Sequence, residues 1–191
     1  MQTRSRTFRL PALLLIAVLS AWSPWVTAAE LSGVTFQDSI PAGAQNISLN
    51  GLGLRKVTFI KVYVGGLYLA APTSDAQTVL DSEQAKAVRM HFLRDVSRDQ
   101  LIEAFEEGFD ANAPDKDGSG PEFERMLTLV PDVKEGEELT FLYLPGAGTT
   151  LTLGAAELGT FTGKPFSDAV FSLWMGPKPP NADLKKGMLG G

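Results

Sequence analysis

The segment "NGLGLRKVTFIKVYVGGLYL", residues 50–69, constrains the fold more than any other part of this 191-residue chain. Apolar and polar residues alternate along it, which is typical of a strand with one buried face. It also carries polar side chains that such a strand does not need, among them Arg55, Lys61 and Tyr63. We expect a short strand and a glycine-bearing turn within residues 46–54, followed by the longest strand of the chain at 57–70.

The rest of the chain alternates between strand and helix patterns. Ser97 and Gln100 have the spacing of a capping box, and an apolar stripe follows them at helical intervals. Few of the strands have the spacing of a βαβ unit, so we predict one α+β domain with helices packed on an antiparallel sheet. Strands are predicted at 33–40, 86–95 and in a β-meander at 132–161; helices at 73–82 (capped by Thr73 or Ser74), 97–109, 123–130 and 165–176; a loop at 110–122; and an extended tail ending in one turn.

The first 29 residues have the pattern of an export signal. Three arginines precede the apolar run "LPALLLIAVLSAW", and small residues follow at "VTAAE". Cleavage after Ala28 and cleavage after Ala29 fit equally well, and the run is short for a membrane anchor. We expect a periplasmic or secreted domain at residues 30–191, with no membrane anchor after cleavage.

Charge and cysteine content exclude several classes of function. Without the three leader arginines, the 17 basic residues fall to 14 against 22 acidic ones, a net charge near −8. Such a chain repels phosphate backbones, so we expect no nucleic-acid partner. The absence of cysteine excludes thiolate catalysis and cysteine-ligated metals. We expect no cofactor and no metal.

Three local motifs are weak. His91 is the only histidine and lies in a predicted strand, with no serine marked as a nucleophile, so we expect a core or sheet-face residue. "DKDGSG" at 115–120 resembles a calcium loop, but Met126 stands where the bidentate glutamate belongs. The segment "GTFTGKP" lacks the glycine spacing of a phosphate loop.

Several separated motifs resemble the chalcone isomerase-like superfamily. The segment "LNGLGLRKVTFIKVYVGGLYL" is similar to its first strand motif, and "VRMHFLRDVSRDQLIEAFEEGF" to the strand and helix that follow. "GEELTFLYLPGAGTTLTLGAAELGTFTGKPFSDAVFSLWMG" resembles its closing hairpin and helix, and "LKKGMLG" the end of secreted bacterial members. The resemblance implies a layered sandwich, a large antiparallel sheet with helices on one face, and an elongated ligand cleft between the layers.

The resemblance also bears on the chemistry. True chalcone isomerases hold their substrate with an arginine, a threonine, a tyrosine and an asparagine. Arg55 matches the arginine, but Tyr63 stands at the threonine position, and the other two positions fall near Leu101 and Gly108. Three of the four polar groups are therefore missing, and leucine and glycine cannot stabilise a developing enolate.

Arg55 and Tyr63 instead resemble the pair that holds a carboxylate in the fatty-acid-binding branch of the superfamily. We expect a non-catalytic protein that binds a small carboxylate-bearing apolar ligand such as a fatty acid, through Arg55, Tyr63 and Arg94. Two alternatives stay open: an intramolecular lyase, or isomerase, acting on an unknown substrate, and an envelope scaffold protein with no ligand. In a scaffold without a ligand, Arg55 and Tyr63 would serve only to tie the turn to the sheet.

Overall fold

The computed structural model describes residue 2 and residues 28–191. The predicted leader, residues 1–29, therefore lies outside the described residues apart from Gln2, Ala28 and Ala29. The described chain begins with a small antiparallel hairpin of β1 (Ala28–Leu31) and β2 (Val34–Gln37). No helix in residues 28–191 is long and apolar enough to cross a membrane.

Seven further strands form one antiparallel sheet in which chain order and spatial order coincide. Each strand pairs with the strand before it, so hairpins and the longer helical connections both join neighbours. The strands are β3 (Ser39–Ala42), β4 (Gln45–Val57), β5 (Ile60–Leu69), β6 (Lys86–Phe92), β7 (Glu138–Leu144), β8 (Gly148–Leu153) and β9 (Ala156–Phe161). The last three confirm the predicted β-meander.

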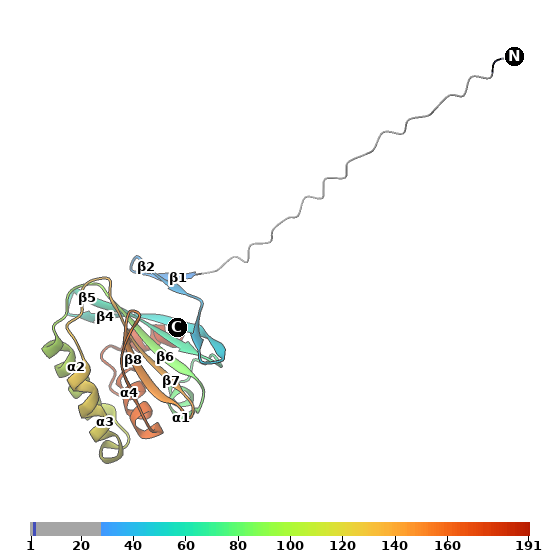
Figure 1. Ribbon diagram of the computed structural model, residues 1–191. Coiled ribbons are helices and arrows are strands. Elements are labelled where there is room, and N and C mark those ends of the chain that lie inside the picture. Colours follow the sequence, from blue (N-terminus) through green and yellow to red (C-terminus); the bar gives the residue numbers. More distant parts are fainter. Residues whose placement is uncertain (1, 3–27) are drawn as a thin grey trace.

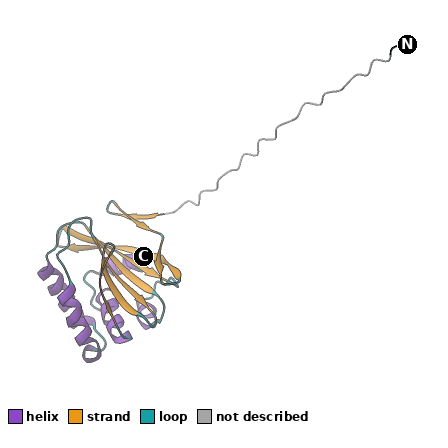
Figure 2. Cartoon of the chain, in the orientation of Figure 1, coloured by secondary structure: helices purple, strands orange, loops and turns teal. Residues whose placement is uncertain are grey.

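Figures 1 and 2 show the longer helices gathered on one side of this sheet. The helix α4 is buried along most of its length and contacts α1, α2 and α3, so it is the centre of the helical layer. This arrangement confirms the predicted α+β layered fold. The helices are α1 (Ala76–Asp81), α2 (Arg98–Asn112), α3 (Lys116–Leu129), α4 (Lys164–Met175) and α5 (Ala182–Met188).

The sheet has a hydrophobic core on each face. Leu67 of β5 points to the helical side, where it belongs to the same cluster as Phe141 and Trp174. Its neighbour Tyr68 points to the other side and packs with Phe36 of β2. Successive side chains therefore point to two buried faces of the sheet, and the β1–β2 hairpin helps to cover the face on which Tyr68 lies.

The predicted glycine turn within 46–54 is wrong. Gly51 and Gly53 lie inside β4, which at 13 residues is longer than the 10-residue β5. A Cβ atom on Gly53 would collide with the backbone of Leu184, and one on Gly51 with that of Gly187. The glycines are required because α5 lies directly on the strand, and the chain turns later, at Thr58 and Phe59.

Three predictions about helices also need correction. Residues 110–122 are mostly helical: α2 runs to Asn112, and α3 begins at Lys116, where the Asp115 side chain caps it. Glycine and proline hide this helix in the sequence, but Phe123 and Met126 bury its inner face. The tail forms helix α5 instead of one turn, and α1 is capped by Asp75 instead of Thr73 or Ser74.

Candidate ligand-binding cavity

A cavity of about 560 Å³ lies between the sheet and the helical layer. Its walls come from β4, β5, β6, one face of α2, the end of α4 and residues 178–180. This volume is within the usual range for small-molecule sites. Most of its lining is apolar, including Val62, Met90, Phe92, Leu101, Phe105 and Leu173.

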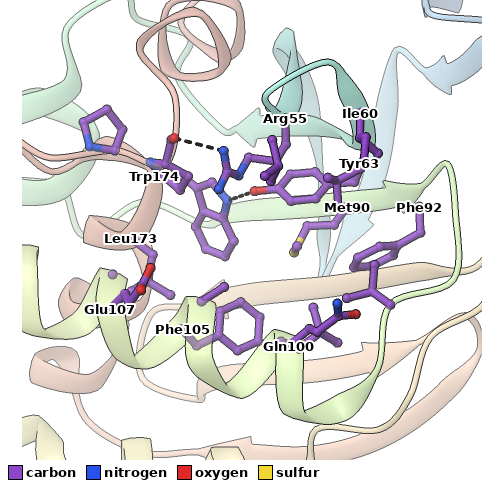
Figure 3. A pocket seen from close by; sticks show the side chains of 18 of the residues that line it. Arg55, Ile60, Tyr63, Met90, Phe92, Gln100, Phe105, Glu107, Leu173 and Trp174 are labelled. Atoms are coloured by element: carbon purple, nitrogen blue, oxygen red, sulfur yellow. Dashed lines mark hydrogen bonds between the residues drawn. The ribbon is translucent and has the colours of Figure 1, made fainter.

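Arg55 and Tyr63 are cross-strand partners on β4 and β5, and both line this cavity. Figure 3 shows the Arg55 guanidinium, the Tyr63 hydroxyl and the Trp174 indole converging at one side of the cavity, with Phe105 and Gln100 across from them on α2. The strand register therefore places a cation and a hydroxyl together over an apolar chamber. Fork-like donors of this kind suit a carboxylate.

The Arg55 side chain is partly committed to the protein itself. Its Nη1 atom donates to the carbonyl oxygens of Lys56 (2.6 Å) and Pro180 (3.1 Å) and to Asn181 Oδ1 (2.9 Å). These bonds tie β4 to the segment before α5, as expected if the arginine has a structural role. Nε and Nη2 have no hydrogen-bond partner within residues 28–191, so the guanidinium retains donors for a ligand.

Tyr63 is buried and held by the helical layer. Trp174 Nε1 donates to its hydroxyl oxygen over 3.0 Å. Burial raises the pKa of Tyr63 to about 12, against the smaller opposing effects of Trp174 and the Arg55 charge. The hydroxyl is therefore neutral at physiological pH, and its own proton finds no acceptor in the described part of the chain. It is a positioned donor at the cavity wall.

Arg94 lines the same cavity from the loop after β6 and is exposed, and its Nε donates to the Asp95 carbonyl oxygen over 3.3 Å. The structure thus places Arg55, Tyr63 and Arg94 in the lining of one cavity, and their role in ligand binding remains a prediction. Lys178 and Glu107 add one charge of each sign to the lining. The cavity lining therefore carries three cationic side chains and one anionic one.

Leu101 and Gly108 also line the cavity. These are the positions at which the resemblance places the tyrosine and the asparagine of true chalcone isomerases. Gly108 allows close packing of α2 on α4, because an added Cβ would lie 2.9 Å from Leu173 Cδ2. The α2 side of the cavity therefore offers no polar group at either position.

The sequence interpretation missed Trp174 as a member of the site. Its side chain is 1% exposed and belongs to the core cluster on the helical side of the sheet. A signal was present, because a buried indole N–H needs an acceptor. The sequence could not show that the acceptor is Tyr63, 111 residues away.

The weak motifs of the sequence do not line the cavity. His91 faces the other side of the sheet, where Nδ1 is 3.2 Å from Glu138 Oε1 and the ring lies edge-on to Phe36. Asp115 of "DKDGSG" is a helix cap. Among the described residues, no group of acidic or histidine side chains is arranged to hold a metal ion.

The family model for chalcone isomerase-like proteins matches residues 28–190. The chain belongs to the chalcone isomerase-like family. A similar solved structure is a fatty-acid binding protein from Arabidopsis thaliana, at a TM-score of 0.69 and 14% sequence identity, covering 85% of this chain and 96% of that one. None of the curated proteins compared with the chain matches it.

At this identity the plant protein supports the fold alone. In this chalcone isomerase-like protein, the residues that line the cavity decide what it can bind. Those residues are a neutral tyrosine donor, an arginine with unused donors and an apolar wall. They can hold an anionic head group and an apolar tail.

Proposed function

We propose that this chalcone isomerase-like protein is a periplasmic, non-catalytic binding protein for a small apolar ligand with a carboxylate, such as a fatty acid. The observation that carries the proposal is the Tyr63 hydroxyl, held by Trp174 beside Arg55 at the wall of an apolar cavity. In the bound state, Arg55 Nε and Nη2 and the Tyr63 proton donate to the carboxylate. The tail lies against Met90, Phe92 and Phe105.

The charges and the wall act together on such a ligand. Charge-assisted hydrogen bonds are about twice as strong as neutral ones, and partial burial beside Tyr63 reduces their screening by solvent. Each methylene buried against the wall contributes about 0.8 kcal/mol. The cavity offers no polar group at Leu101 and Gly108 to drive a reaction, which favours binding over isomerisation.

The plant neighbour is described as a fatty-acid binding protein. Binding of the same class of ligand by this chain is part of the proposal, since the two sequences share only 14% identity. The periplasmic location rests on the export signal expected at residues 1–29.

The test combines native mass spectrometry with calorimetry. We expect the protein purified from the exporting cell to carry a co-purifying carboxylic acid, and the delipidated protein to bind fatty acids. Arg55→Met should weaken binding by about tenfold or more, because it removes charge-assisted hydrogen bonds worth about 1.5–3 kcal/mol.

Lys116→Met is the matched control. It removes the same charge from an exposed position at the start of α3 that does not line the cavity. Equal affinity for wild type and Arg55→Met would overturn the assignment of the carboxylate site. Turnover of a chalcone above the uncatalysed rate would overturn the non-catalytic function.

A further inference from the structure

The turn between β4 and β5 exposes an apolar cluster that the fold does not need. Phe59 is 93% exposed, and Val57 and Ile60 are about half exposed, at 50% and 51%. Within the described residues, these three are the only large hydrophobic side chains exposed to this degree. We call residues 56–61 the hairpin tip.

The chemistry of the turn does not explain these residues. Val57 pairs with Ile60, so the loop has two residues, Thr58 and Phe59. Such loops favour asparagine or aspartate followed by glycine, whereas here a β-branched threonine adopts a φ of 54°. The pair Thr58-Phe59 favours neither this type of turn nor solubility. A binding role of the tip would explain why these two residues stand there.

The tip is also basic in an acidic protein. The sequence contains no acidic residue between Asp38 and Asp75, while the whole chain carries a net charge of −5. Lys56 and Lys61 are direct cross-strand partners, and both are exposed. Like charges in this arrangement destabilise a hairpin, and an anionic partner would relieve the repulsion.

The tip lies at the mouth of the cavity. Val57 and Ile60 belong to the cavity lining, together with Arg55 and Arg94. Figure 3 shows Ile60 at the edge of the cavity, on the same side as Tyr63. The acidic side chain of the adjacent loop, Asp95, is paired with Lys134 Nζ at 3.0 Å, so it does not cancel the basic charge of the tip.

We propose that the hairpin tip docks on the surface of an anionic lipid bilayer. Phe59 inserts at the level of the head groups, with Val57 and Ile60 beside it. Lys56 and Lys61 lie against lipid phosphates and keep their ammonium groups in water. This combination of exposed apolar side chains flanked by lysines is the same that holds amphipathic segments at membrane interfaces.

A lipid surface fits the tip better than a protein surface does. A stable protein interface buries roughly 800 Å² on each partner and needs a shape-matched patch. The tip is a projecting turn of six residues, suited to insertion into a fluid surface. Docking here would turn the cavity mouth toward the bilayer, although the docking itself needs no ligand in the cavity.

Vesicle binding tests the proposal. Vesicles of phosphatidylcholine alone and of phosphatidylcholine mixed with phosphatidylglycerol, both free of fatty acid, are sedimented with the protein. We expect binding to the mixed vesicles that weakens at high salt. Lys56→Gln/Lys61→Gln should weaken it about 25-fold, at about fivefold per lysine, and Phe59→Ser about tenfold or more.

The matched control is Lys116→Gln/Lys186→Gln, which removes the same charge from exposed positions in α3 and α5. All proteins carry the same N-terminus, so any binding through the leader is common to them. The proposal is overturned if the wild type ignores anionic vesicles, or if the tip variants bind as the control does. Unchanged melting temperatures of the tip variants would show that they still fold.

A second measurement reports the orientation on the membrane. The chain has no cysteine, so a single environment-sensitive dye can be placed at Thr58→Cys or at Ala147→Cys in the β7–β8 turn. The antiparallel pairing puts Ala147 at the opposite end of the sheet from the tip. We expect a blue shift on vesicle binding at position 58 only; a shift at 147 or at both would overturn docking through the tip.

Discussion

Trp174 Nε1 in α4 donates a 3.0 Å hydrogen bond to the hydroxyl oxygen of Tyr63 in β5. This bond joins the helical layer to the sheet at the wall of the cavity. Because the indole occupies a lone pair of the oxygen, the tyrosine proton takes no part in this bond and is available to a ligand in the cavity that Tyr63 lines. One interaction thus supports the fold and positions the proposed ligand donor.

Tyr63→Phe should therefore affect both stability and binding. The buried indole N–H loses its acceptor, which costs about 1–3 kcal/mol in the free energy of unfolding. A double-mutant cycle with Trp174→Phe, measured by urea denaturation, should give a coupling energy of about 1 kcal/mol. A coupling near zero would contradict the hydrogen bond.

Tyr68→Phe is the control for binding. Tyr68 also loses a hydrogen bond in this variant, the partly buried one from its hydroxyl to the Gln37 carbonyl, but it lies on the other face of the sheet. We expect fatty-acid affinity to fall in Tyr63→Phe alone. A similar fall in both variants would mean that binding responds to general destabilisation.

The layered fold could be predicted because the strand alternation and the capping box of α2 are local signals. The glycines of β4 could not be interpreted locally. Gly51 and Gly53 indicate a turn by composition, yet they serve contacts with α5 more than a hundred residues later. Arg55 and Tyr63 could be named as site residues from the resemblance. The role of Trp174 and the exposure of the hairpin tip could not, because both depend on tertiary packing that sequence spacing does not show.

The contact between β4 and α5 predicts an unusual sensitivity to one methyl group. Gly53→Ala places a Cβ against the Leu184 backbone, which cannot move without displacing α5. We expect a loss of several kcal/mol in the free energy of unfolding, at the upper end of what overpacking causes. Gly120→Ala in α3 is the matched control: its Cβ meets nothing within 4 Å, so it should stabilise by about 0.5–1 kcal/mol. Thermal unfolding measures the stability of both variants, and equal changes in stability would contradict the close packing of α5 on β4.

The apolar wall predicts a dependence on chain length. Across a series of saturated fatty acids, the dissociation constant should fall about fourfold for each added methylene until the tail fills the cavity. The methyl ester of each acid should bind at least tenfold more weakly to the wild type, because the ester carries no charge for Arg55. In Arg55→Met the preference for the acid over the ester should shrink, because Tyr63 and Arg94 still line the cavity. Calorimetry would contradict the proposed anchor if the ester bound wild type as tightly as the acid.

Lys86 is the most deeply buried basic side chain in the described part of the protein, with no exposed surface. Its Nζ donates to the carbonyl oxygens of Val79 (2.8 Å), Leu80 (3.2 Å) and Ser82 (3.3 Å) at the end of α1. Burial lowers its pKa to about 8, despite the opposing charge of Asp168. The ammonium therefore caps a helix at an energetic cost that depends on pH.

The sign of this dependence follows from proton binding. Between pH 8 and 10.5 the unfolded chain keeps the Lys86 proton that the folded protein has released, so folding becomes more favourable as pH rises. The stability of wild type relative to Lys86→Met should increase by about 2–3 kcal/mol across this range. Comparing the two proteins at each pH removes the contribution of Tyr63, Tyr68 and Tyr143, whose raised pKa values, about 12, act in the opposite direction above pH 10. Urea denaturation at pH 7, 9 and 10 measures the difference, and a difference independent of pH would show that Lys86 is not desolvated in the folded state.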